Sequence, residues 1–142
     1  MNLVVDASIA LKWFVAEDDS DAALAARTGH TMIAPDLLPI ECRNAFLNKI
    51  RRRELSVAAA RRLERDLDAI EIDILPAAAF LSRAFAIAIE LGEPIYDCIY
   101  VAMAVTTERV FLTADKEFAL VVGNSSLGRE RVMLLADLVA GG

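Results

Sequence analysis

The sequence predicts an α/β fold in which a mostly parallel sheet is covered by helices on both faces. Short, continuously apolar runs alternate with longer segments of helical spacing along the 142 residues. Such runs are typical of strands buried on both faces, as in a parallel sheet between two helical layers. The strand candidates are residues 2–5, 31–34, 72–75, 109–114 and 131–135, of which 72–75 is ambiguous.

The helices between these strands are indicated by apolar spacing and by residues that begin or end a helix. Ser56 is a good N-cap for the helix that follows it, and Gly92 ends another. The expected helices are residues 9–15, 19–28, 39–53, 57–70, 77–91, 95–107 and a short segment from Asp115.

The composition bounds the class of protein. A chain of 142 residues, 56% of them hydrophobic, fits a single domain that spans residues 1–142. No apolar run reaches the ~18 residues of a membrane span, and the N-terminus lacks a signal-peptide pattern, so we expect a cytoplasmic protein. Cys42 and Cys98 stand alone, which indicates neither a disulfide framework nor a zinc site. The single histidine, His30, cannot form a metal cluster or a catalytic triad.

Four acidic residues are predicted to meet at one edge of the sheet. Asp6 follows the first strand candidate and Asp115 follows the fourth, so both emerge at the carboxyl ends of parallel strands. Glu41 and Asp97 lie near helix starts, which line the same edge in an α/β arrangement. Asp97 is conspicuous because residues 95–107 otherwise read as a helix buried on all sides, where a lone carboxylate pays a desolvation cost.

Each acid alone has an ordinary structural interpretation. Asp6, Asp97 and Asp115 could be helix N-caps, and Glu41 could be a first-turn acid. Together, four like charges at one edge repel one another, and a divalent cation would relieve that repulsion. Mg²⁺ and Mn²⁺ prefer oxygen ligands and keep positions open for water and phosphate, which favours hydrolysis of phosphate esters without a side-chain nucleophile.

Four motifs, in order, resemble the PIN-domain family, and within it the VapC-type toxins of toxin–antitoxin pairs. They are VVDASIALKWF, APDLLPIECRNAF, YDCIYVAMA and FLTAD, and the resemblance extends over nearly the whole chain. It implies a PIN-like three-layer α/β/α sandwich with about five strands. It also implies an Mg²⁺- or Mn²⁺-dependent endoribonuclease that cuts RNA with an activated water. The family's catalytic and metal-binding positions fall on Asp6, Glu41, Asp97 and Asp115.

The resemblance also implies supporting residues and partners. Ser8, Asn44 and Thr113 match polar positions that accompany the family's acids, whereas Glu117 could be an extra acid of the site or an exposed helix residue. The family implies a homodimer and a cognate antitoxin whose C-terminal segment covers the site. Trp13 and Phe14 could line a groove for that segment, although plain core packing is the favoured interpretation.

The basic residues are concentrated in one span. Residues 39–65 hold eight of the 15 basic residues and three acids, a net charge of +5 in a chain of net charge −6. Arg51, Arg52 and Arg53 in this span are candidate RNA-binding residues, and the alternative is a solvated helix end with cations at its negative pole.

Two other functions compete with the nuclease. An aspartyl-phosphate phosphatase also presents an Asp after a strand such as LVVD, but it needs a second Asp where Ser8 stands. A non-catalytic interaction module with the PIN fold is the second alternative, and cation-dependent cleavage of RNA would distinguish an enzyme from such a module.

Overall fold

The computed structural model describes residues 1–141, with the side chains of residues 1–138. Its centre is one sheet of five parallel strands in the order β3-β2-β1-β4-β5. The strands are β1 (Asn2–Val5), β2 (Thr31–Pro35), β3 (Asp73–Leu75), β4 (Val110–Thr113) and β5 (Val132–Leu134). The α/β class and the five-stranded parallel sheet predicted from the sequence are therefore confirmed.

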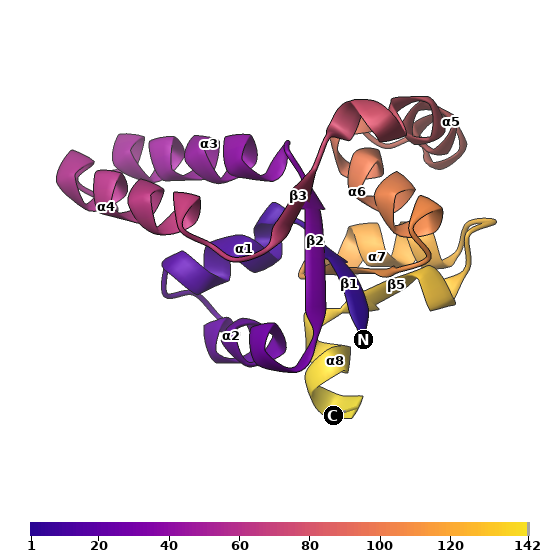
Figure 1. Cartoon of the computed structure of the whole chain (residues 1–142), viewed down its shortest axis with the longest axis horizontal. Coiled ribbons are helices and arrows are strands. Elements are labelled where there is room, and N and C mark those ends of the chain that lie inside the picture. The colour runs from indigo at the N-terminus through magenta and orange to yellow at the C-terminus, as the bar shows by residue number, and fades with distance from the viewer. Residues whose placement is uncertain (142) are drawn as a thin grey trace.

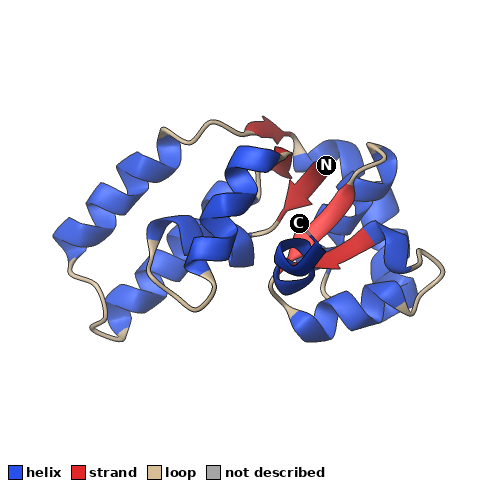
Figure 2. Ribbon diagram, turned by 90° about the horizontal axis from the view of Figure 1, so that it is seen from below, coloured by secondary structure: helices blue, strands red, loops and turns tan. Residues whose placement is uncertain are grey.

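The helices form the two outer layers of the sandwich. They are α1 (Ala7–Phe14), α2 (Ser20–Gly29), α3 (Leu38–Arg51), α4 (Val57–Asp68), α5 (Leu81–Leu91), α6 (Ile95–Thr106), α7 (Lys116–Gly123) and α8 (Leu135–Gly141). Two short 3₁₀ helices, η1 (Ala77–Phe80) and η2 (Arg129–Arg131), precede α5 and β5. Helices α1 to α4 lie on one side of the sheet and α5 to α7 on the other, while α3 and α4 project from the sheet as a hairpin (Figures 1 and 2).

The core lies on both faces of β1 and β4. Leu3, Val4 and Val5 of β1 are fully buried, since both faces of this central strand are covered. Helix α6 packs against β1, β2 and β4, and its residues from Cys98 to Ala104 are all buried. Because residues 98–104 are buried, this part of the helix is apolar around its whole circumference. A charged group there would have no contact with water.

The order of the strands places a crevice at one point of the sheet. From β1 the chain moves outward to β2 and β3, and then crosses back to β4 and β5 on the other side of β1. Val5 pairs with Leu112, so β1 and β4 end side by side. In open parallel sheets, ligands bind where the strand order reverses in this way, outside the carboxyl ends of the strands.

Most predicted boundaries agree with the structure, and the differences have local causes. Ser56 caps α4 by accepting a hydrogen bond from the backbone N–H of Ala59, and Gly92 ends α5 in the left-handed region at φ 67°. Helix α3 stops at Arg51 rather than residue 53, where Arg53 adopts a left-handed φ of 61°. The expected helix from residue 77 begins as a 3₁₀ turn. The apolar run of residues 131–135, which predicts a strand alone, ends at Leu134 as β5 and continues directly into α8.

Trp13 and Phe14 pack as core residues. Both are partly buried against the core, and the ring of Phe14 meets that of Phe46 edge to face at 6.4 Å. The indole N–H of Trp13 donates to the carbonyl of Ala23 over 2.9 Å, which fixes α1 against α2.

Within residues 1–141, no helix has the length and apolar character that crossing a bilayer requires.

Candidate active site

Asp6 lies where β1 meets α1, at the carboxyl edge of the sheet. It is the N-cap of α1, and its Oδ1 accepts a 3.3 Å hydrogen bond from the backbone N–H of Ile9. The Ser8 hydroxyl donates to the same oxygen, and the Thr113 hydroxyl donates to Oδ2 over 2.7 Å. Donors from α1 and β4 therefore hold both carboxylate oxygens and limit rotation of the side chain.

The hydroxyl groups of Ser8 and Thr113, which bind Asp6, also bind the backbone at Ala114 and Asp115. The backbone N–H of Ala114 donates to the Ser8 hydroxyl over 3.0 Å, and that of Asp115 donates to the Thr113 hydroxyl over 3.1 Å. Asp115 is also the N-cap of α7, accepting from the backbone N–H of Phe118 at 3.0 Å. The N-cap interpretation is thus confirmed for Asp6 and Asp115, which lie at the carboxyl ends of the neighbouring strands β1 and β4.

Asp97 has no such structural role. It is the third residue of α6, whose N-cap position is occupied by Pro94, so the alternative that Asp97 caps this helix is wrong. Among the described residues its carboxylate accepts no hydrogen bond and forms no ion pair. A partly buried carboxylate without a partner in its own fold is costly, and it is available to a ligand.

Glu41 reaches the same edge from the opposite helical layer. It lies in the first turn of α3, as the sequence indicated, and is partly buried. Its Oε1 accepts a hydrogen bond from the hydroxyl of Tyr100 on α6. Tyr100 was not among the predicted site residues, because a tyrosine inside an apolar helix reads as a core residue.

The pKa values of three of these acids are raised. Burial raises the pKa of Asp6 to about 6, although hydrogen bonds from Ser8 and Thr113 oppose the change. Burial also raises the pKa of Glu41, as do the charges of Asp97 and Asp6, whereas the bond from Tyr100 lowers it. The pKa of Asp97 is raised by burial first and then by the charge of Asp115. Electrostatic repulsion therefore acts on Glu41 from Asp97 and Asp6, and on Asp97 from Asp115.

No arginine or lysine of the described residues neutralises this set of acids. The ion pairs in this part of the chain use other carboxylates, those of Glu54, Glu64 and Asp68. The donor set is made only of oxygen atoms, which fits Mg²⁺ or Mn²⁺ better than zinc. Within residues 1–141, however, no three acidic, histidine or cysteine side chains lie in a ready-made cation cage. A cation would have to draw the freer side chains, above all Asp97, toward the fixed Asp6.

The other predicted residues differ in their relation to this edge. Ser8 and Thr113 lie within the hydrogen-bond network of Asp6, as described above. Asn44 is exposed on α3, and Glu117 is exposed in the first turn of α7, and neither forms a side-chain hydrogen bond within the described residues. Arg51 is the last residue of α3, Arg52 and Arg53 follow it, and all three are exposed. This end of α3 projects away from the sheet (Figure 1).

The cysteines and the histidine do not supply a nucleophile or base here. Burial raises the pKa of the Cys42 thiol to about 12 and that of Cys98 to about 11, so both remain protonated at neutral pH. His30 precedes β2 at the amino end of the sheet, where its Nδ1 lies 2.8 Å from the N-terminal amine. Hydrolysis at the carboxyl edge would therefore need an activated water.

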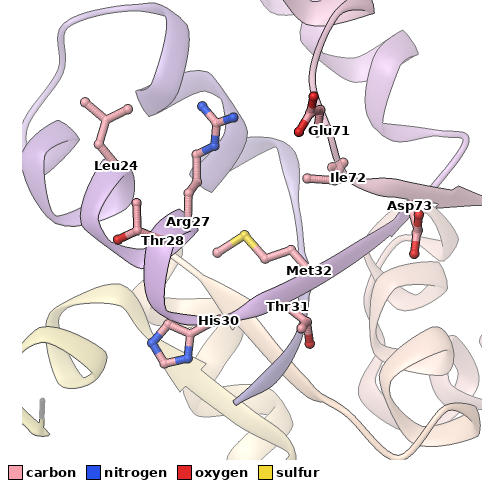
Figure 3. A pocket seen from close by; sticks show the side chains of 9 residues that line it. All are labelled: Leu24, Arg27, Thr28, His30, Thr31, Met32, Glu71, Ile72 and Asp73. Atoms are coloured by element: carbon pink, nitrogen blue, oxygen red, sulfur yellow. The ribbon is translucent and has the colours of Figure 1, made fainter.

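A cavity of about 550 Å³ lies at the opposite, amino edge of the sheet, between α2 and the starts of β2 and β3. Figure 3 shows its lining, with Arg27 and His30 on one side and Glu71 and Asp73 on the other. None of the four predicted acids lines it. Although this cavity is large, its lining lacks the acids on which the predicted hydrolysis depends.

Comparison with known families decides the relationship. The family model described as PIN domain matches residues 3–124. The chain belongs to the PIN domain family. The predicted resemblance is therefore confirmed at the level of the family, and the matched residues contain all four acids at the carboxyl edge. A search of curated protein sequences found no significant match.

Solved structures share this PIN fold at low sequence identity. PAE2754 from Pyrobaculum aerophilum has 21% identity and a TM-score of 0.68, over 99% of this chain and 88% of that one. VapC20 from Mycobacterium tuberculosis, a toxin that cleaves the sarcin-ricin loop, has 11% identity and a TM-score of 0.66, over 83% and 93%. A toxin–antitoxin complex from Klebsiella pneumoniae has 15% identity and a TM-score of 0.59, over 94% and 97%. At these identities the likeness establishes the fold.

Proposed function

We propose that this PIN domain is an Mg²⁺- or Mn²⁺-dependent endoribonuclease, the toxin of a type II toxin–antitoxin pair. One observation supports this above the others. Asp6, Glu41, Asp97 and Asp115 lie on four separate elements at the carboxyl edge of the sheet, and charges among them raise the pKa values of Glu41 and Asp97. No basic side chain of the described residues forms an ion pair with any of the four. Such an arrangement is costly unless a cation binds there. VapC20, a toxin that cleaves the sarcin-ricin loop, shares the fold.

The proposed cation ligands are Asp6, Glu41, Asp97 and Asp115. When bound, the cation would supply a water of lowered pKa as the nucleophile and offset negative charge on the scissile phosphate. Asp6 would provide a fixed anchor, because Ser8 and Thr113 hold its oxygens in place. Asp97 keeps both carboxylate oxygens free of hydrogen bonds within the described residues, so it can turn toward the cation.

The backbone around the acids also favours a phosphate. Helices α1, α6 and α7 all begin at this edge, next to Asp6, Asp97 and Asp115 respectively. The positive ends of their dipoles stabilise negative charge near the first turn. These helix starts would bind and orient the phosphate of an RNA chain once the carboxylate charges are balanced.

The exposed end of α3 is the proposed RNA-binding surface. Arg51, Arg52 and Arg53 have no ion-pair partner among the described residues, whereas Arg43 pairs with Glu64 and Asp68 at 2.7 Å. Three free arginines in succession suit non-specific contacts to phosphates. Because α3 begins at the acidic edge and ends at these arginines, one helix would connect RNA binding with cleavage.

The proposed protein partners are a cognate antitoxin and a second copy of the chain, both in the cytoplasm. The Klebsiella pneumoniae complex and the VapBC2 complex of Rickettsia felis, which has a TM-score of 0.62, support the first, because both contain an antitoxin. An apolar face of α5 supports the second. Leu81, Phe85 and Ile89 recur every four residues on it and are 45%, 61% and 69% exposed.

A metal titration of RNA cleavage tests the enzymatic proposal. Wild type should cleave a structured RNA with Mg²⁺ or Mn²⁺ and lose cleavage in EDTA, whereas Asp97→Asn should be at least ~100-fold slower at saturating metal. Asp66→Asn is the matched control, because Asp66 is exposed on α4 and far from the acidic edge. A folded wild type that cleaves no RNA with either cation would favour the non-catalytic interaction module.

A further inference from the structure

We infer that Tyr100 is a positioning residue that fixes the Glu41 carboxylate for cation binding. The inference rests on the proposed function, since it concerns the same four acids. Tyr100 lies on α6 and Glu41 on α3, which belong to opposite layers of the sandwich (Figure 1). Their hydrogen bond therefore joins the two layers directly at the edge of the sheet.

The Tyr100 hydroxyl is held in one place by the packing of its ring. The residue is 1% exposed, and its ring centroid lies 6.3 Å from that of Phe111 on β4. Helical side chains lean toward the N-terminus of their helix, so the phenol of Tyr100 extends back toward the start of α6, where Asp97 lies. A rigid donor is thus presented at the level of the acids.

The hydrogen bond occupies only part of the Glu41 carboxylate. Tyr100 donates to Oε1, and no donor from the described residues reaches Oε2. A carboxylate offers about four acceptor positions, so one phenol leaves Oε2 and a lone pair of Oε1 available to a cation. Hydrogen bonds from neighbouring groups orient metal-binding carboxylates, and their loss weakens metal affinity.

Tyr100 also connects Glu41 with Asp97. The two residues of α6 are three positions apart, so they lie on the same face of the helix. This face would then supply one ligand, Asp97, and the group that orients a second ligand, Glu41. The buried phenol remains a donor, because burial and the adjacent Glu41 raise its pKa.

The chain provides a matched control for this role, since it contains only two tyrosines. Tyr96 lies one turn earlier on α6 and is 61% exposed. Mn²⁺ affinity would be measured by titration, following the electron paramagnetic resonance signal of the free ion. We expect Tyr100→Phe to weaken Mn²⁺ binding about tenfold, as is typical for loss of a group that orients a ligand. Tyr96→Phe should stay within about twofold of wild type.

A double-mutant cycle separates positioning from a purely structural role. Glu41→Gln should weaken Mn²⁺ binding, and adding Tyr100→Phe to it should have no further effect, because the orienting bond would then have no ligand to act on. A full effect of Tyr100→Phe in the Glu41→Gln background would overturn the inference. Equal or tighter Mn²⁺ binding by Tyr100→Phe alone, or a large fall in its metal-free melting temperature, would also overturn it.

The same titration distinguishes the inference from the function on which it rests. If wild type binds Mn²⁺ and Tyr100→Phe binds it equally well, only the role of Tyr100 fails. If folded wild type binds no Mn²⁺, the proposed metal-dependent function fails with it. The kinetic expectation is a rise in the Mn²⁺ concentration needed for half-maximal cleavage, with KM for RNA unchanged, because Tyr100 is buried and cannot contact RNA.

Discussion

The Thr113 hydroxyl donates a 2.7 Å hydrogen bond to Oδ2 of Asp6, and this bond joins the carboxyl ends of β4 and β1. Thr113 is fully buried, so its end of the bond is shielded from solvent. It fixes the position of the first acid relative to the last one, Asp115, whose backbone N–H donates to the same hydroxyl. The crevice is therefore organised by the fold before any ligand binds.

The metal-free protein should lose stability as the pH rises through the pKa of Asp6. That pKa is about 6 in the folded chain and 3.8 without the fold, so the folded state binds more protons between these values. The stability that the neutral Asp6 side chain contributes is therefore complete below about pH 4 and is lost as the pH rises to about 6. By pH 7 this loss amounts to roughly 2–3 kcal/mol of the free energy of unfolding.

Chemical denaturation in EDTA at pH 4 and pH 7 would measure this cost. Relative to wild type, Asp6→Asn should gain about 2 kcal/mol in free energy of unfolding between the two pH values, since Asn cannot ionise. Asp66→Asn, on the exposed surface of α4, controls for the pH dependence of the rest of the chain. A constant difference between Asp6→Asn and wild type at both pH values would contradict the raised pKa.

Asp97→Asn should leave metal-free stability unchanged or increase it. The substitution removes repulsion from Asp115 and Glu93 and breaks no hydrogen bond within the described residues. Mg²⁺ at about 100 times its Kd should raise the melting temperature of wild type by roughly 10 °C, and this rise should disappear in Asp97→Asn. A marked destabilisation of metal-free Asp97→Asn would instead assign this carboxylate a structural role.

Replacing Arg51, Arg52 and Arg53 together with Gln should weaken RNA binding. Each phosphate contact that is lost reduces the slope of log affinity against log salt by about 0.7 for a single strand, so the triple variant should lose about 2. Mg²⁺ binding should stay as in wild type, because these side chains lie at the far end of α3. Unchanged RNA affinity would instead support the alternative interpretation, in which the three arginines are solvated residues at a helix end.

Phe85→Glu should convert a dimer into a monomer, as measured by sedimentation velocity. A charge in the centre of the apolar face of α5 would be buried without a partner in the interface, which is strongly unfavourable. Val57→Glu is the control, since Val57 is equally exposed at 61% but lies at the start of α4. If Phe85→Glu and Val57→Glu had the same effect on mass, the α5 face would not be the interface.

The sequence was sufficient to predict the sheet and its acidic edge. Continuous apolar runs such as residues 2–5 identify buried parallel strands, and the chain order then places Asp6 and Asp115 on one edge. The Gly92 helix end was also predictable, since a left-handed φ favours glycine. Helix α8 could not be predicted in the same way, because its apolar start continues the run of β5 without a break.

The detailed geometry of the acids was not predictable. Whether an acid caps a helix depends on one residue of offset, and Pro94 rather than Asp97 takes the cap position of α6. The bond from Tyr100 to Glu41 joins residues 59 positions apart, and no local pattern reports such a contact. The spacing of the acids along the sequence also could not show that, among the described residues, they do not form a preformed cation site.

Because Asp6 and Asp115 each cap a helix as well as presenting a charge, their replacement would harm the scaffold together with any chemistry. Asp97 caps no helix, so under the proposed function a single substitution there would abolish catalysis while the fold is retained.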